Sequence, residues 1–243
     1  MNFSGISRQT LIGKLLRTPL KLIPAKANEE YVHYGCGPTA PVDWINFDAS
    51  PTARLQKFPF LSYVFINKYF TKLGFPIFPK NIIFGDIVRG LPIEPNSCKA
   101  IYCSHVLEHL SLTDFRIALR NSYNYLQADG IFRLVLPDLE KLTNDYLQSN
   151  DPSASIIFME QTYLGKKIRP RGLLPFFRQW LGNSSHLWMW DYKSLSLELE
   201  QVGFRNIRRA NFGDSAEPRF ASVECLERWQ DCLGIECSKS HGW

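Results

Sequence analysis

The chain has 243 residues, of which 45% are hydrophobic and 21% are charged, and its net charge is +5. This composition is typical of a globular protein of one or two domains, and it excludes a disordered chain, a collagen-like repeat and a small disulfide scaffold. The basic excess is mild, so it permits an anionic ligand or an anionic membrane surface but does not indicate nucleic-acid binding.

The first 28 residues are expected to form a separate basic amphipathic segment. They contain five Lys and Arg residues and no Asp or Glu, and apolar residues recur at helical spacing from Leu11 to Leu16. A helix that packs on the domain is favoured, and the alternatives are an organelle transit peptide or a membrane-surface helix.

Five short apolar runs are predicted to be β-strands, at residues 31–34, 44–48, 81–86, 100–104 and 131–136. Helices are predicted at 113–126 and 192–202, the second ending at Gly203, and a closing pair of strands at 206–210 and 222–226. Strands that alternate with helices predict a doubly wound, mainly parallel α/β sheet. Strands that are apolar without clean alternation fit a sheet covered on both faces.

Two stretches interrupt this alternation and are expected to be insertions that select the substrate. Residues 51–80 mix aromatic and basic side chains, and residues 151–190 hold a basic cluster followed by several tryptophans. The main domain is therefore predicted to cover 29–230, with a C-terminal tail at 231–243.

The cysteines and the hydropathy favour a cytoplasmic protein. None of the six cysteines forms a C-x-x-C pair, so they are interpreted as reduced thiols, with a disulfide near the C-terminus as the alternative. No apolar run approaches the ~18 residues that a transmembrane helix needs. A peripheral membrane contact through the basic N-terminal segment stays open.

Small or polar residues follow four consecutive predicted strands. They are Gly35 and Gly37, Asp48, Asp86, and Ser104 with His105. Open α/β sheets bind ligands at the carboxyl ends of their strands, glycine lets the backbone approach a ligand closely, and a carboxylate such as that of Asp48 accepts hydrogen bonds from two ribose hydroxyls.

This ordered set resembles the class I S-adenosylmethionine-dependent methyltransferases. The matching motifs are Y-V-H-Y-G-C-G-P at 31–38, W-I-N-F-D at 44–48, G-D-I at 85–87, S-H-V-L-E-H-L at 104–110, L-Q-A-D-G-I-F-R-L-V-L-P-D at 126–138 and H-L-W-M-W-D at 186–191. The chain is most similar to a bacterial-type branch associated with surface-polysaccharide synthesis. The resemblance implies a Rossmann-like seven-stranded sheet with an antiparallel C-terminal hairpin, S-adenosylmethionine as cofactor, and a small-molecule or saccharide acceptor.

The resemblance also implies a role for each strand end. Gly35 and Gly37 would pass under the methionine part of the cofactor, and Asp48 would hold its ribose. Asp86 and Ile87 would contact adenine through its exocyclic amine and one ring face.

Ser104 and His105 would line the methionine side, where the acceptor enters. An oxygen acceptor benefits from a base that takes the hydroxyl proton, and His186 and His105 are the candidates. Trp188 or Trp190 would stack on a sugar or on another apolar face of the acceptor.

The connection between the first two strands is unusually short. Only residues 38–47 separate Gly37 from Asp48, whereas parallel strands usually need a crossover of roughly a dozen or more residues. We therefore predict that the first helix of the fold is missing or vestigial. The 51–80 stretch or the N-terminal helix would then cover that side of the cofactor pocket.

A zinc site is the competing interpretation of residues 105–109, which match the H-x-x-E-H pattern of inverted zinc proteases. On a helix, His105 and His109 would share one face and Glu108 would act as base. The third ligand, Glu140 or Glu160, has no supporting motif. No metal is therefore predicted.

The activity and several single residues admit more than one interpretation. The chain could be a non-catalytic cofactor-binding module of an assembly, or a peripheral-membrane methyltransferase that acts on a lipid-linked substrate. Asp138 could orient the acceptor or cap a helix, His33 is expected to be a core histidine, and His109 is expected to cap or pack a helix. The sequence does not indicate the oligomeric state.

Overall fold

The computed structural model describes residues 30–56, 77–167 and 185–240. The predicted N-terminal segment and the central parts of both predicted insertions lie outside these ranges. Among the described helices, none is both long enough and apolar enough to span a membrane.

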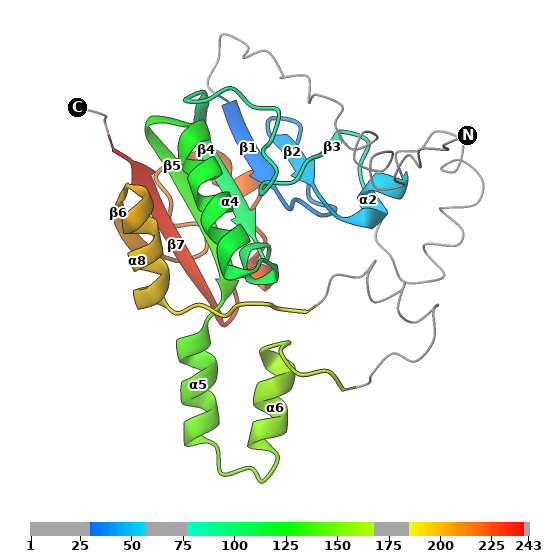
Figure 1. Ribbon diagram of the computed structural model, residues 1–243, viewed down its shortest axis with the longest axis vertical. Coiled ribbons are helices and arrows are strands. Elements are labelled where there is room, and N and C mark those ends of the chain that lie inside the picture. Colours follow the sequence, from blue (N-terminus) through cyan, green and yellow to red (C-terminus); the bar gives the residue numbers. More distant parts are fainter. Residues whose placement is uncertain (1–29, 57–76, 168–184, 241–243) are drawn as a thin grey trace, which may run out of the picture.

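Seven strands form one sheet (Figure 1). They are β1 Glu30–Tyr34, β2 Ile45–Asp48, β3 Ile82–Phe84, β4 Cys98–Ser104, β5 Leu126–Pro137, β6 Phe204–Ala210 and β7 Cys232–Lys239. Their order is β3-β2-β1-β4-β5-β7-β6, and β7 alone runs opposite to the other six strands. The predicted mainly parallel seven-stranded sheet with an antiparallel C-terminal pair is therefore confirmed.

The described helices lie around this sheet. They are α2 Pro51–Gln56, α4 Leu112–Tyr125, α5 Leu139–Gln148, α6 Ala154–Gln161 and α8 Tyr192–Val202, with short 3₁₀ turns η2 Leu107–His109, η3 Pro218–Ser222 and η4 Leu226–Arg228. In Figure 1, α4 and α8 lie across the same face of the sheet, and α5 and α6 project beyond the end of β5. Gly203 ends α8 with φ = 116°, the left-handed conformation that glycine adopts without strain.

Each face of the sheet has its own core. On one face, residues such as Val32 and Ile101 pack with Phe115 of α4. On the other face, Tyr31 and Tyr102 pack with side chains of the connection between β6 and β7, residues 211–231 (the β6–β7 connection). Coverage on both faces explains why all five residues of β1 are buried and why its sequence shows no alternation.

The connection between β1 and β2 contains turns and no helix, as its length predicts. Trp44 in this connection donates a hydrogen bond from Nε1 to Ser222 Oγ at 2.9 Å, and its ring lies 5.6 Å from that of Phe220. The β6–β7 connection therefore packs where the missing helix leaves the sheet uncovered.

The C-terminal end of the sheet differs from the sequence-based prediction. Residues 222–226, predicted to be a strand, lie in the β6–β7 connection, and most of the predicted tail at 231–243 is the strand β7. The buried residues Leu233, Ile235 and Cys237 alternate along β7 and face the core, so the antiparallel partner of β6 begins later than predicted. All six cysteines lie in the described ranges, and none is in a disulfide.

A fully buried arginine fastens the β6–β7 connection to the sheet. Arg133 of β5 has a side-chain exposure of 0%, and its guanidinium pairs with carboxylates of Glu224, Asp214 and Glu236. The same group lies 4.6 Å from the ring centroid of Trp229 and donates to the backbone carbonyl of Asn211. A buried charge is tolerated only when it is paired and hydrogen-bonded in this way.

Replacing Arg133 should therefore lower the stability of the folded protein. We expect Arg133→Met to lower the free energy of unfolding by about 3–5 kcal/mol, because the buried Glu224 carboxylate loses its cation. Urea denaturation followed by circular dichroism measures the change. Arg120→Met, on the exposed side of α4, is the control and should cost less than about 0.5 kcal/mol. Equal losses in the two variants would contradict this account.

Candidate functional site

Four neighbouring strands end at one edge of the sheet. The order β3-β2-β1-β4 places Asp86, Asp48, the glycine loop at 35–37 and Ser104 side by side in that sequence. The strand order reverses between β1 and β4, and ligands of open α/β sheets bind at such a switch point. The topology thus brings together the strand ends that the sequence analysis selected.

Hydrogen bonds hold the glycine loop against the end of β2. Gly37 N donates to Asp48 Oδ2 at 2.9 Å, and Ser50 N donates to Asp48 Oδ1 at 2.8 Å. Each carboxylate oxygen has two acceptor positions, so each retains one after these bonds form. Asp48 is thus fixed in direction, and at 6% exposure a small part of it remains accessible to a ligand.

The two glycines of this loop have different surroundings. Gly35 has φ = 64° and Gly37 has φ = 55°, so both occupy the left-handed region. A Cβ atom on Gly35 would lie 2.0 Å from Val106 Cγ2, whereas a Cβ atom on Gly37 would meet no described atom within 4 Å. Gly35 therefore allows the segment after β4 to pack on the loop, and Gly37 borders open space.

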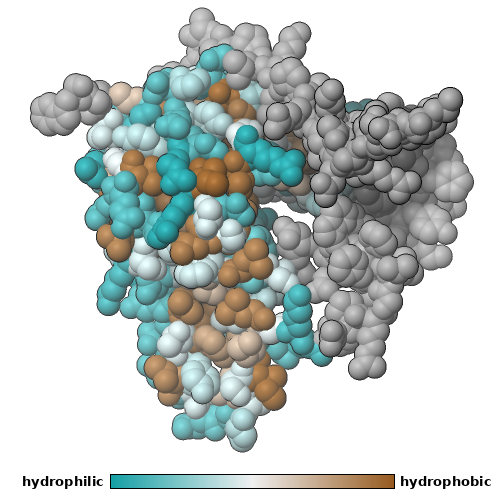
Figure 2. Space-filling model, in the orientation of Figure 1, coloured by the Kyte–Doolittle hydropathy of each residue, from teal (hydrophilic) through white to brown (hydrophobic). Residues whose placement is uncertain are grey.

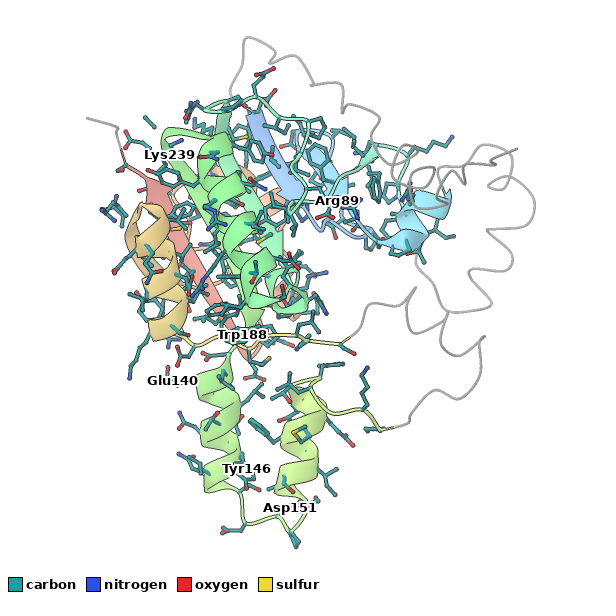
Figure 3. The ribbon with its side chains drawn as sticks, viewed as in Figure 1. Arg89, Glu140, Tyr146, Asp151, Trp188 and Lys239 are labelled. Atoms are coloured by element: carbon teal, nitrogen blue, oxygen red, sulfur yellow. The ribbon has the colours of Figure 1, made fainter. Side chains whose placement is uncertain are left out.

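The end of β3 provides one accessible carboxylate. Asp86 Oδ1 accepts a hydrogen bond from Val88 N at 2.9 Å, and Asp86 Oδ2 lies 3.4 Å from Nε of Arg89, which Figure 3 labels beside this loop. Ile87 is only 5% exposed and packs in the core. The contact expected between Ile87 and a ligand ring stays a prediction.

Arg228 of η4 covers the end of β4. Its Nε donates to Ser104 Oγ at 3.0 Å and its Nη2 donates to the Ser104 carbonyl, and Ser104 is 2% exposed. The side chain of Ser104 is thus already engaged by Arg228. The sequence predicted that Ser104 would line the ligand site. In the structure its side chain does not present a free surface to a ligand.

The surroundings of His105 favour its charged form. Its Nε2 donates to the Arg228 carbonyl at 2.9 Å, and its Nδ1 lies 3.2 Å from Glu108 Oε1, so both ring nitrogens face acceptors. Burial by itself would lower the pKa of His105, but contacts with Cys232 and Glu108 raise it to about 10. An imidazolium has no lone pair to accept a proton, which argues against His105 as the general base.

The H-x-x-E-H segment does not form the helix that the zinc-protease interpretation requires. His105 precedes η2, which contains only three residues, so His105 and His109 do not share a helical face. The proposed third ligands are also engaged elsewhere, since Glu140 lies 2.7 Å from Arg209 Nη2 and Glu160 lies 2.6 Å from Lys167 Nζ.

His186, which is far along the chain, lies beside this segment. Leu187 N and Trp188 N donate to the Glu108 carbonyl at 2.7 and 3.1 Å, which brings His186 beside η2. His186 Nε2 and His109 Nε2 each lie 4.0 Å from Glu108 Oε1. Burial lowers the pKa of His186, which favours its neutral form. The sequence singled out Glu108, His109 and His186 separately, but it did not predict that they lie together.

A cavity of about 680 Å³ lies beside η2. It is lined by Glu108, His109 and His186, and also by His105, Glu160, Tyr163, Asp231 and Cys232. Trp188, on the segment that Figure 3 shows between the sheet and the α5–α6 pair, is 41% exposed. Trp190 is instead buried and stacks on Phe115 at 4.1 Å between ring centroids, so it belongs to the core.

Contacts also settle the expectations for Asp138 and His33. Asp138 Oδ1 accepts a hydrogen bond from Glu140 N at 2.9 Å, so it caps α5, which is the second of the two roles considered for it. His33 is 3% exposed, and its ring lies 5.3 Å from that of Tyr102, as expected of a core histidine.

A family model matches part of this chain. Residues 67–134, less than half of the chain, match the model of a methyltransferase domain family. No curated protein matches the chain.

Among the solved structures, several methyltransferases match the chain at low sequence identity. A SAM-dependent methyltransferase from Archaeoglobus fulgidus is 16% identical with a TM-score of 0.45, the match covering 96% of this chain and 95% of that one. A SAM-dependent methyltransferase from Thermotoga maritima is 12% identical with a TM-score of 0.46, covering 88% and 84%. Phosphoethanolamine N-methyltransferase 2 from Haemonchus contortus, solved with S-adenosyl-L-methionine, is 10% identical with a TM-score of 0.44, covering 96% and 52%. Similarities this low do not by themselves assign an activity.

The different surroundings of the two glycines predict different costs of substitution. Gly37→Ala should lower the free energy of unfolding by about 1 kcal/mol, through backbone strain alone. Gly35→Ala should cost about 1–3 kcal/mol more, because its Cβ atom also displaces Val106. Urea midpoints of the two variants give the comparison. A Gly37→Ala variant less stable than Gly35→Ala would refute this distinction.

Proposed function

We propose that this protein transfers a methyl group from S-adenosylmethionine to a hydroxyl-bearing small molecule or glycan. The observation that carries the proposal is the switch-point edge, where a glycine loop and the carboxylate of Asp48 are joined by a hydrogen bond. The match of residues 67–134 to a methyltransferase domain and the motif resemblance support it.

The residues present at this edge fit such a cofactor. Asp48 retains acceptor positions for ribose hydroxyls, and the open space beside Gly37 admits a group close to the backbone. Asp86 keeps a partly exposed carboxylate for an exocyclic amine. When bound, the cofactor supplies a methyl group on a sulfonium centre, and the protein supplies orientation.

The acceptor would occupy the cavity next to η2. This cavity begins at the end of β4, beside the switch point, and it contains His186 together with the neighbouring Glu108 and His109. The exposed face of Trp188 on the same segment suits stacking against a sugar ring. An acceptor from surface-polysaccharide synthesis, methylated in the cytoplasm, is the specific form of this proposal that the motif resemblance supports.

The cofactor site is tested by calorimetric binding of S-adenosylmethionine and S-adenosylhomocysteine. We expect Asp48→Asn to weaken binding roughly 10- to 100-fold, because a charged acceptor of ribose hydroxyls is lost while its size is kept. Asp43→Asn, which changes an exposed carboxylate in the connection that precedes β2, should leave affinity unchanged. If folded wild-type protein binds neither compound, or if both variants bind like wild type, the cofactor assignment is wrong.

A membrane-associated form of this activity has one structural observation in its favour. The α5–α6 pair projects from the domain and exposes apolar side chains, including Leu147 at 71%, Ile156 at 61% and Met159 at 43%. Figure 2 shows apolar residues gathered over this pair. Lys166 and Lys167 border the same surface as Ile156. Apolar side chains beside basic ones are typical of a surface that contacts anionic lipid.

Vesicle co-sedimentation distinguishes a methyltransferase that binds membranes from one that does not. If α5 and α6 contact lipid, the full chain should bind vesicles containing anionic phospholipid, and Ile156→Glu should reduce the bound fraction severalfold. Leu197→Glu, which places the same charge at an equally exposed position on α8, serves as the matched control and should bind like wild type. Absence of binding by wild type would dismiss the lipid-linked acceptor.

A further inference from the structure

We propose that Glu108, His109 and His186 bind a divalent metal ion of the zinc class, with one coordination position open to the cavity beside η2. The site stands on these residues alone. Only the role given below to a metal-bound acceptor rests on the proposed methyl transfer.

The first observation is the convergence of three ligand atoms. One carboxylate oxygen of Glu108 and one ring nitrogen from each histidine all lie within 4.8 Å of one another. Bonds of about 2.0–2.2 Å in tetrahedral geometry place such atoms about 3.4 Å apart. The two nitrogens lie 4.0 Å from Glu108 Oε1 and no more than 4.8 Å from one another, so shifts of less than 1 Å at each side chain complete the coordination.

The second observation is the state of the Glu108 carboxylate. Glu108 is 0% exposed, and neither of its carboxylate oxygens accepts a hydrogen bond from any residue of the described ranges. His105 Nδ1 lies 3.2 Å from Oε1, but the contact does not have hydrogen-bond geometry. Buried carboxylate oxygens need partners, and a coordinated cation is one that they commonly have.

The third observation is that the ligand segments are oriented by contacts behind them. His109 Nδ1 lies 3.0 Å from the Ser185 carbonyl and must therefore donate to it, which leaves the lone pair on Nε2. Metal-binding histidines typically have such a carbonyl behind them. The two hydrogen bonds from Leu187 N and Trp188 N to the Glu108 carbonyl fix the distance of His186 from η2.

The ligand types indicate which ion would bind and what it would do. Two imidazoles and one carboxylate suit Zn²⁺ and similar borderline ions, and they suit Mg²⁺ or Ca²⁺ poorly. Three protein ligands leave a fourth position for water or for an acceptor hydroxyl, whose pKa the ion would lower. In this arrangement His186 is a ligand rather than a base, and the acceptor hydroxyl would release its proton to water in the cavity as the oxygen takes the methyl group.

Cobalt titration of the full chain tests the site directly. After treatment with a chelator, wild-type protein should bind one equivalent of Co²⁺ with a visible absorption band, and Zn²⁺ should displace it. His109→Gln and His186→Gln should each weaken Co²⁺ binding about 100-fold or more, since loss of even an indirect partner costs 10–100-fold. His33→Gln, which alters a core histidine outside the cluster, should retain stoichiometric binding.

Stability provides a second readout that does not depend on the spectrum. Zn²⁺ in excess should raise the melting temperature of wild type and of His33→Gln, but not of the two ligand variants. Binding of less than 0.1 equivalent by folded wild type, or unchanged binding in both ligand variants, would overturn the proposal. S-adenosylhomocysteine binding is measured on the same samples. Protein that binds this compound but no metal refutes the metal site alone, and the reverse result refutes the cofactor assignment alone.

Discussion

The buried charge of Arg133 must be balanced, and this requirement determines how the β6–β7 connection packs on the sheet. Arg133 lies in the middle of β5 between Phe132 and Leu134, which pack on the α4 side, so its side chain points to the opposite face and meets Phe220 and Trp229. A guanidinium in a low-dielectric interior has to be surrounded by carboxylates and carbonyls, and most of those groups come from the β6–β7 connection and from β7. That requirement holds an irregular segment against the sheet, and with it the aromatic side chains of Phe220 and Trp229.

The same constraint extends to the site. Because the connection is fixed at Arg133, η4 delivers Arg228 to the end of β4, where it binds Ser104 and the ring of His105. His105 adopts φ = 53° there and directs Nδ1 toward Glu108. The next residue, Val106, packs on Gly35. Contiguous contacts therefore connect the buried arginine with both the glycine loop and the histidine cluster.

Much of this fold follows from local patterns in the sequence, and the features that depend on distant contacts do not. Apolar runs located the parallel strands, and parallel topology brings their carboxyl ends to one edge. The short β1–β2 connection predicted a missing helix, since chain length alone limits a crossover. By contrast, an arginine within an apolar strand gives no sign that Glu224 and Asp214 will meet it. The meeting of His186 with Glu108 depends on two main-chain hydrogen bonds that no periodicity encodes.

The charges around the cavity bear on the kind of acceptor that fits. Two of the carboxylates at the cavity already have cations, since Glu160 pairs with Lys167 and Asp231 lies 3.4 Å from Lys141 Nζ. A divalent ion held by Glu108 and two neutral histidines would therefore leave the cavity positively charged. Such a field stabilises a developing alkoxide and disfavours a protonated amine. On the proposed activity, oxygen rather than nitrogen is the acceptor atom that this cavity would favour.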